Sequence, residues 1–410
     1  MLEDLRILHA RSSDQRVCLR RSVVGPFAGS GSMMRFLSIM ADLRVLSSLF
    51  WSLLSDNPKR QFGEISHQPM QRSGLSPADN GCMNVSVLIP TRARADKLEA
   101  CMKALSEQDW LPGDEVVVGL DGPDPESESR ARSAFHSSVC TLRIIERPQE
   151  GYIALRSALL PELNGDALIS LNDDVVPGAG FIREHRTACE SAGDSAAFVG
   201  HSPFATIEAP TVIDRLVSET SWVFFYDSML GVSDRSHDFG FRHLFGLNFS
   251  ARLNTIRCAG GFTDMPNIYG YDDIELGHRL TGNGLSIRFL REAYASHDHR
   301  MTADQLLSRE HALGVSACHY ATSCPEFSRD VFGQDILDKG YLTENAERVE
   351  TDSELCETLA HEFLSFGEQR SMPEPIDALF KRFRPLKKHL WRQGLIAEAA
   401  RLGLVSTRAA

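Results

Sequence analysis

The chain has 410 residues, of which 42% are hydrophobic and 24% are charged, so wholesale disorder is excluded. This length is enough for one large domain or two ordinary ones. The formal net charge is -12, and because so acidic a protein repels phosphate backbones, we expect no nucleic-acid partner.

Cysteine usage and hydropathy indicate the compartment. Nine cysteines are scattered along the chain without a Cys-x-x-Cys pair, so we expect no structural zinc site of the usual spacing. A reducing, cytoplasmic compartment fits this usage best. No run of about 20 uninterrupted apolar residues occurs, so we expect no membrane-spanning helix.

Residues 1–80 are typical of an N-terminal extension. Apolar residues recur at helical spacing over Phe36–Leu54, which predicts an amphipathic helix, and a polar segment over residues 56–81 predicts a linker. Such a helix either docks on the main domain or makes a peripheral membrane contact. The internal charges Asp42 and Arg44 argue against a signal peptide.

From Asn84 onward, strands and helices alternate. We expect strands at residues 85–89, 115–120, 141–146 and 167–171, and helices at 94–108, 126–136, 152–162 and 180–192. This alternation predicts an α/β fold with parallel pairing and right-handed crossovers. Since ligands bind outside the carboxyl ends of such strands, Pro90–Arg94, Asp121 and Asn172–Asp174 should lie along one rim.

The pattern weakens after Ala197. We expect a strand at 245–250, helices at 252–259 and 271–283, a strand at 285–290 and only helices beyond residue 301. The expected organisation is an extension over residues 1–80, a catalytic domain over 81–300 and a helical C-terminal region over 301–410.

The strongest local motif is Asn172-Asp173-Asp174, which directly follows a buried strand. Two acids at a sheet rim suit a hard divalent cation, because magnesium or manganese takes one or two carboxylates and fills its other positions with water and phosphates. The alternative is an ordinary turn with a helix cap, where Asp and Asn are common.

A second acidic motif, Asp272-Asp273, opens a predicted helix. Glu275 and Arg279 are four residues apart and can pair across one turn. Asp273 shares a mostly apolar face, so it should point inward, where burial raises its pKa and makes it a better general base. Alternatively, the two acids only offset the helix dipole.

Three further side chains are candidates for the site. His297 or His299 can supply an imidazole ligand to a metal. Because residues two apart on an extended segment point to opposite sides, we expect at most one of them to reach it. Arg156, near the start of a helix, can meet a base or phosphate. The alternatives are structural histidines and an ordinary surface arginine.

Taken in order, these pieces resemble the family 2 glycosyltransferases, over about residues 84–300. The segments that carry the resemblance are Val85–Arg94, Asp121, Gly151–Leu159 with Arg156, Asn172-Asp173-Asp174, Phe245–Ser250, Gly260-Gly261-Phe262, Tyr271-Asp272-Asp273 and His297. The resemblance implies a GT-A fold: a Rossmann-like, mostly parallel sheet flanked by helices, here with helical N- and C-terminal extensions. The segment Arg309–Glu326 also resembles a helix that follows the catalytic domain in some members.

The resemblance also implies roles for residues of this chain. The donor nucleotide would contact Pro90, Thr91, Arg94, Asp121, Gly151, Arg156, Asn172 and Asp173. The metal would bind Asp174 with His297, or with His299 in its place. The catalytic base would be Asp273, and the acceptor side would comprise Asp272, Gly261 and Asn248. The family more often has an acid where Asn172 stands, and usually a Glu where Asp272 stands.

The implied reaction is a sugar transfer that depends on manganese or magnesium and proceeds with inversion. The donor would be a nucleotide diphosphate sugar, and the acceptor a carbohydrate, a lipid-linked molecule or another hydroxyl compound. We expect the protein in the cytoplasm, with a peripheral contact at the inner face of a membrane as an open alternative.

Two alternative functions compete with this interpretation. A nucleotidyltransferase would need a basic, glycine-rich loop after the first strand, and Pro90–Asp96 has no glycine. A non-catalytic nucleotide or carbohydrate binder that keeps the fold is the main alternative, and the presence of both Asp174 and Asp273 argues against it.

Two other segments remain ambiguous. The aromatic residues of Ser202–Arg242 either stack on a sugar or fill the core. The basic residues within 381–392 alternate with Phe and Leu, which predicts either a packed helix with a solvated face or a contact with anionic lipid or a lipid-linked acceptor.

Overall fold

The computed structural model describes residues 82–263, 265 and 268–405. The predicted amphipathic helix at Phe36–Leu54 and the linker that follows it lie outside the described residues. Within the described part, no helix combines the length and hydropathy needed to cross a membrane.

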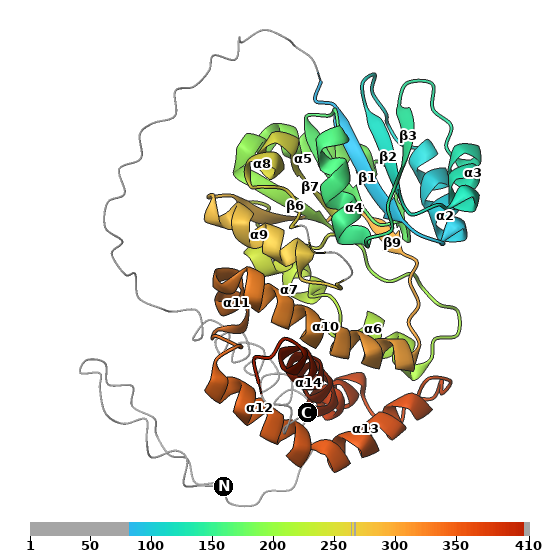
Figure 1. Cartoon of the computed structure of the whole chain (residues 1–410). Helices are drawn as coiled ribbons and strands as arrows, with labels where there is room; N and C mark the ends of the chain where they lie inside the picture. The colour runs from blue at the N-terminus through green and yellow to red at the C-terminus, as the bar shows by residue number, and fades with distance from the viewer. Residues whose placement is uncertain (1–81, 264, 266–267, 406–410) are drawn as a thin grey trace, which may run out of the picture. The chain divides into compact units, whose positions relative to one another are not determined.

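A seven-stranded sheet forms the centre of the fold (Figure 1). Its strands, in spatial order, are β3 (Thr141–Arg147), β2 (Glu115–Asp121), β1 (Val85–Thr91), β4 (Ala167–Leu171), β7 (Asn248–Arg252), β6 (Ala196–Gly200) and β8 (Ser286–Leu290). Every residue of β1, β2 and β4 is buried, as expected for strands covered on both faces. The sheet is mostly parallel, as predicted from the sequence, since four of its six neighbouring strand pairs are parallel.

The sheet is parallel where the sequence alternates and mixed beyond that region. Strand β1 pairs in parallel with β2 and β4, and β2 with β3, while β7 runs antiparallel to both β4 and β6. Strand β6 was not predicted, and β7 begins three residues later than expected, at Asn248. The antiparallel β7 brings the loop that precedes it, Phe245–Leu247, next to the residues after β4, where Asn172 N–H donates to the carbonyl of Leu247 at 3.2 Å.

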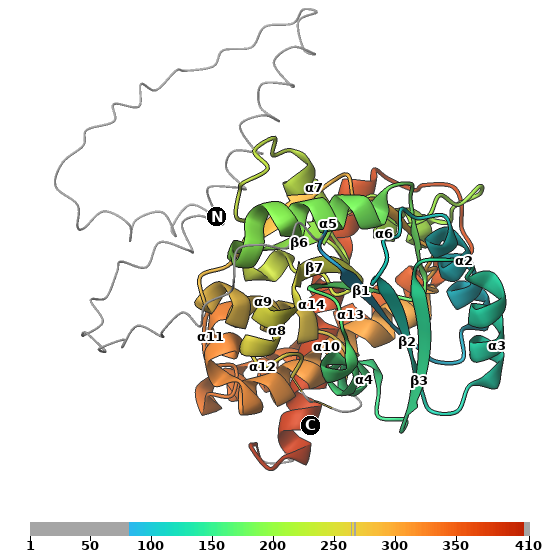
Figure 2. The ribbon, with the colours of Figure 1, turned by 90° about the horizontal axis from the view of Figure 1, so that it is seen from above.

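Helices cover the sheet on both faces. They are α2 (Ala95–Ser106), α3 (Pro125–Ala134), α4 (Tyr152–Leu159), α5 (Phe181–Ala192), α8 (Leu253–Cys258) and α9 (Asp272–Gly282), with short α6 (Val212–Ser218) and α7 (Tyr226–Leu230) in the connection after β6. Figure 2 shows α5 on one side of the strands and α4 on the other.

A two-stranded sheet stands apart from the main one and was not predicted. Strand β5 (Val175–Pro177) pairs antiparallel with β9 (Ala295–His297), and its register sets Val175 opposite His297. The segment that follows the acidic motif is therefore paired with a segment more than a hundred residues later. This pairing positions the metal-ligand candidates described below.

The C-terminal region is helical, as predicted. It comprises α10 (Ala303–Ser323), α11 (Pro325–Phe332), α12 (Lys339–Thr351), α13 (Ser353–Ser365) and α14 (Ile376–Arg401), which pack together on one side of the sheet layer (Figure 1). Residues of α6 share an apolar cluster with α13 and α14.

Two glycines allow α10 and α14 to cross in close contact. A Cβ on Gly314 would lie 1.9 Å from the carbonyl oxygen of Trp391, and one on Gly394 would lie 2.1 Å from that of His311. Real Cβ atoms do not approach a backbone oxygen so closely, so each helix needs a glycine at the crossing. The contact sets Trp391 and its neighbours on α14 against the site described next.

Candidate active site

A cavity of about 1080 Å³ lies at the carboxyl ends of β1, β2 and β4 and extends to the C-terminal helices. The predicted site residues that line it are Pro90, Thr91, Arg94, Asp121, Gly151, Arg156, Asn172, Asp173, Asp174, Asp272, Asp273, His297 and His299. The predicted rim is thus confirmed. The two acidic motifs, about a hundred residues apart in the chain, lie at one cavity.

Asp121 connects the end of β2 to the start of α4. Its carboxylate accepts hydrogen bonds from the backbone N–H groups of Glu150 and Gly151, at 2.8 and 3.1 Å. Gly151 has a φ of 94°, in the region that favours glycine, and it precedes the first residue of α4. The residue type at 151 is therefore required by the turn that joins the loop to the helix.

The side chain of Asp173 is held by residues at the end of β1. Thr91 Oγ1 donates to Asp173 Oδ2 at 2.7 Å, and the Arg94 guanidinium lies 3.2 Å from Asp173 Oδ1 while also contacting Asp174. Burial raises the pKa of Asp173 to about 6, against the opposing charge of Arg94. The nucleotide loop predicted at residues 90–94 is thus joined directly to the acidic motif.

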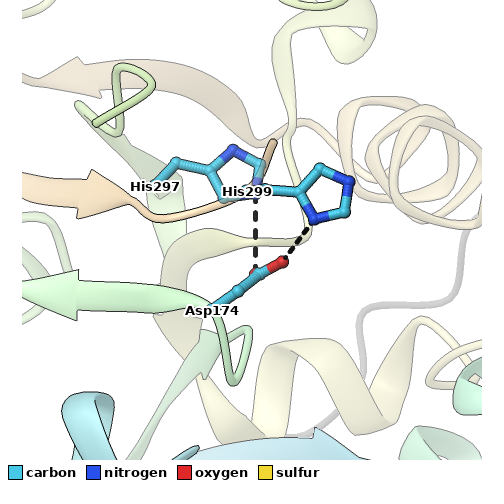
Figure 3. A group of neighbouring side chains, drawn as sticks. All are labelled: Asp174, His297 and His299. Carbon is cyan, nitrogen blue, oxygen red and sulfur yellow. Dashed lines mark ion pairs between the residues drawn. The ribbon is translucent and has the colours of Figure 1, made fainter. Parts of the chain in front are cut away.

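Asp174, His297 and His299 form a cluster with metal-ligand geometry (Figure 3). One ligand atom from each side chain lies within 4.8 Å of the others. His297 Nε2 is 3.5 Å from Asp174 Oδ1, and His299 Nδ1 is 3.1 Å from Asp174 Oδ2. The β5–β9 register carries His297 to this position.

The expectation that only one of the two histidines reaches the site was wrong. Their rings are stacked, with centroids 5.5 Å apart and an interplanar angle of 17°. The reason is that β9 ends at His297, and Asp298 N–H turns to donate to the carbonyl of Asp174 at 2.7 Å. The alternation of an extended strand therefore does not continue to His299.

The donor set of this cluster fits a divalent cation. Among the described residues, Asp174 Oδ1 and His297 Nδ1 are buried polar atoms without a hydrogen-bond partner, although such atoms in proteins are almost always satisfied. Burial alone would raise the pKa of Asp174, but His297, His299 and Arg94 hold it well below its usual range. Asp174 is thus an ionised carboxylate beside two imidazoles, a combination that binds metals.

Arg156 joins the two acidic motifs. Its guanidinium donates to Asn172 Oδ1 at 2.6 Å and to Asp272 Oδ2 at 3.3 Å, and it lies over the rings of Tyr152 and Phe262. Only 2% of the residue is exposed, so it is not an ordinary surface arginine. Because its charge is already shared between protein partners, Arg156 orients both motifs as well as lining the cavity.

Asp272 and Asp273 occupy different environments. Asp272 is 3% exposed and accepts hydrogen bonds from Tyr152 Oη at 2.8 Å and from Arg156. Asp273 accepts from the backbone N–H of Gly246 at 2.9 Å and from that of Ile274 at 2.8 Å. Burial, followed by the charge of Asp272, raises the pKa of Asp273 to about 7.

The predicted ion pair between Glu275 and Arg279 is confirmed, with Arg279 Nε 2.7 Å from Glu275 Oε1.

Two residues predicted on the acceptor side lie elsewhere. Asn248 is fully buried in β7, where its amide bonds His185, Ser202 and the carbonyl of Ala293, so it acts in the polar core. Gly261 has a φ of 69°, and its N–H donates to the carbonyl of Ile256 after α8. It ends that helix and does not line the cavity, so both expected contacts are corrected.

Sequence reasoning missed several residues of the site. Gly246 bonds Asp273 through its N–H, and its carbonyl accepts from Arg156 at 3.2 Å. Trp391 Nε1 donates to Tyr271 Oη at 3.1 Å, directly before the Asp272-Asp273 motif. Tyr271 has a φ of 67°, which is unusual outside glycine. Gly246 and Tyr271 lie in segments that carry the resemblance, but their contacts have no local signal, because each is made with a partner distant in the sequence.

Comparisons with known proteins agree with this architecture. The family described as "Glycosyl transferase family 2" matches residues 86–230. The chain is also similar in fold, at a TM-score of 0.51 and 14% identity, to the mannosyltransferase PcManGT from Pyrobaculum calidifontis in complex with GDP-Man and Mn2+; the similarity covers 90% of this chain and 97% of that one. The fold is therefore that of the GT-A glycosyltransferases. More narrowly, residues 86–230 of the chain are similar to the family 2 glycosyltransferases.

The chain is also similar to part of two longer curated proteins with a named function. Pre-mycofactocin glycosyltransferases from two strains of Mycobacterium tuberculosis are each 26% identical to it in an alignment of 276 residues that covers 64% of this chain. The match takes in 51% of each relative, so the chain spans about half the length of the curated relatives it matches.

Proposed function

We propose that this protein is a metal-dependent, inverting glycosyltransferase that moves a sugar from a nucleoside diphosphate donor to a hydroxyl acceptor. The observation that carries the proposal is that Asp273 and the Asp174–His297–His299 cluster line one cavity. The first can take a proton and the second can hold a cation beside a diphosphate. Both are needed for displacement of a charged leaving group by a neutral hydroxyl.

Asp273 is the proposed general base. A carboxyl whose pKa is raised to about 7 is largely ionised at slightly alkaline pH and still basic enough to accept a proton from an attacking hydroxyl. The N–H groups of Gly246 and Ile274 orient its two oxygens. Inversion follows when the base and the leaving group stand on opposite sides of the anomeric carbon in a single displacement.

Asp174, His297 and His299 are the proposed metal ligands, with Arg94 and Asp173 beside them. A bound divalent cation supplies Lewis-acid stabilisation of the leaving diphosphate. Arg94 adds a positive charge at the same end of the cavity, and Asp121 and Gly151 support the wall of the nucleotide site.

We infer that manganese is preferred to magnesium. Two of the three ligands are imidazoles, whereas magnesium strongly prefers oxygen ligands and water. The bound Mn2+ of the mannosyltransferase with the same fold supports this preference.

We also propose a reducing, cytoplasmic location. The eight described cysteines support it, because all of them are free thiols.

A panel of nucleotide sugars, incubated with Mn2+ and with simple hydroxyl acceptors, tests the proposal. The expected result is release of a nucleoside diphosphate that Asp273→Asn abolishes while nucleotide binding persists. Nucleotide binding by the wild-type protein without any sugar release, across the whole panel, would instead favour the non-catalytic binder that keeps this fold.

A further inference from the structure

The side of the cavity away from the sheet is formed by the C-terminal helices. On α14, Phe380, Arg384, Lys387, Lys388 and Trp391 recur at intervals of three and four residues, so they share one face, and all of them line the cavity. This basic face had two readings in the sequence, a solvated surface and a contact with lipid. Its position at the cavity adds a third interpretation, a contact with a ligand that enters the cavity.

Two of these cations have no partner within the described part of the chain. Arg384 and Lys388 are exposed and make no hydrogen bond or ion pair with any residue that the structure describes. They stand four residues apart, where like charges destabilise a helix. Helix stability therefore does not account for them, and in a chain with a net charge of -12 neither does overall composition.

The neighbouring charges do not neutralise this face. Lys387 Nζ donates to the carbonyl of Trp222 at 2.5 Å, lies 5.2 Å from the centre of its ring and is 3.5 Å from Glu310. Glu310 is buried and also pairs with Arg309 at 2.8 Å, so its single charge is already shared by two cations. The wall consequently keeps an excess of positive charge.

Exposed aromatic rings line the same cavity as these cations. Phe225 and Tyr269 line the cavity and are 46% and 45% exposed, which is unusual for side chains of that size. Trp222, in contrast, is buried and belongs to the core. A cavity lined by exposed rings and by cations without a partner among the described residues suits a flat apolar group attached to an anion.

We propose that this wall, formed by Arg384, Lys388, Phe225 and Tyr269, is the acceptor subsite, and that the acceptor carries an anionic phosphate or carboxylate next to a flat apolar group. The inference rests on the proposed function. The donor takes the rim of the sheet, and the acceptor hydroxyl must reach Asp273. The rest of the acceptor then extends toward α10 and α14, where these side chains meet it.

Phenyl phosphate, which combines an aromatic ring with an anion, is the probe. It is titrated calorimetrically into the full-length protein with Mn2+ and with excess GDP and UDP, which occupy the donor side. We expect Arg384→Gln and Lys388→Gln each to weaken its binding about tenfold, the loss of one hydrogen bond to a charged group. Neutral benzyl alcohol should bind at least about tenfold more weakly than phenyl phosphate to the wild-type protein.

Lys381→Gln is the matched control, because Lys381 is an exposed residue of the same helix that does not line the cavity. It should leave the affinity for phenyl phosphate unchanged. Equal affinities in the Lys381 and Lys388 variants, or equal affinities for the charged and neutral probes, would overturn the subsite. These measurements require no turnover, so they remain interpretable if the proposed activity fails.

The anion can belong to a soluble acceptor or to a lipid headgroup, and sedimentation with phosphatidylglycerol vesicles distinguishes the two. Sedimentation that Arg384→Gln abolishes and phenyl phosphate competes away assigns the anion to a headgroup. Binding of phenyl phosphate without sedimentation assigns it to a soluble acceptor. Vesicle binding that persists in Arg384→Gln and in Lys388→Gln, without any binding of phenyl phosphate, contradicts the proposal.

Discussion

The backbone N–H of Gly246 donates a 2.9 Å hydrogen bond to Oδ2 of Asp273, while the carbonyl of the same residue accepts from Arg156. A single residue therefore orients the proposed base and the cation that joins the two acidic motifs. A Cβ on Gly246 would lie 3.1 Å from the Arg156 guanidinium and 3.3 Å from Cβ of Asp273, closer than side chains usually pack.

We therefore expect Gly246→Ala to lower kcat by on the order of a hundredfold, because a small displacement of a catalytic group is costly. Affinity for the nucleoside diphosphate should change little. Steady-state kinetics and a nucleotide titration of the same preparation check both points. A fall in nucleotide affinity with kcat preserved would show that Gly246 acts on the donor and not on Asp273.

The pH dependence of turnover follows from the raised pKa of Asp273. The base is active when ionised, so kcat should rise with pH through a midpoint near 7. A pH–rate profile under saturating donor and acceptor checks this. A rate that stays flat between pH 5.5 and 8.5 would contradict a titrating base in that range.

Stability should show the opposite trend. The folded-state pKa of Asp273 lies above its ordinary value of 3.8, so the favourable contribution of its neutral form is lost as pH rises from about 4 to about 7. Asp273→Asn removes this dependence. We expect the variant to melt at a higher temperature than the wild type at pH 8, and the difference to shrink toward pH 4.

Metal affinity should depend on both histidines. We expect His297→Ala and His299→Ala each to weaken Mn2+ binding by about a hundredfold or more, as measured by electron paramagnetic resonance of the free ion. Asp298→Asn is the matched control, since its carboxylate pairs with Lys97 at 2.8 Å and is no part of the cluster. If His299→Ala binds Mn2+ as the control does, only His297 belongs to the site.

The helix crossing predicts a stability effect. Gly314→Ala or Gly394→Ala should destabilise the fold by about 3 kcal/mol or more, because the added methyl group meets a backbone carbonyl that cannot move independently. Gly282→Ala serves as the control, since no atom lies within 4 Å of its Cβ position at the end of α9. Thermal unfolding of the variants checks the difference, and equal midpoints would refute the close crossing.

Local patterns predicted the parallel half of the sheet and the order of the motifs. The buried Val- and Ile-rich strands and the acids that follow them are signals within a few residues, and the rule that parallel strands end at one rim brought Asp121 and Asp174 to the same cavity. Glu275 and Arg279 were paired correctly for the same reason, because their contact lies within one turn of helix.

The remaining features depend on contacts between distant segments. The β5–β9 pair brings His297 beside Asp174 across more than a hundred residues, and a strand as short as Ala295–His297 has too little pattern to detect. Asn248 was expected beside the acceptor because of its place in a motif, and its amide instead satisfies His185 in the core. The basic face of α14 could be located at the cavity only from the packing.

The position of α14 means that one wall of the cavity is formed by a helix later in the chain than the rest of the site. The sheet, both acidic motifs and both histidines are synthesised before residue 376, yet Trp391 and Lys388 complete one wall. A single protease cut between α13 and α14, at residues 366–375, would therefore leave the proposed donor side formed and the proposed acceptor side open. Such a fragment should bind nucleotide and transfer nothing.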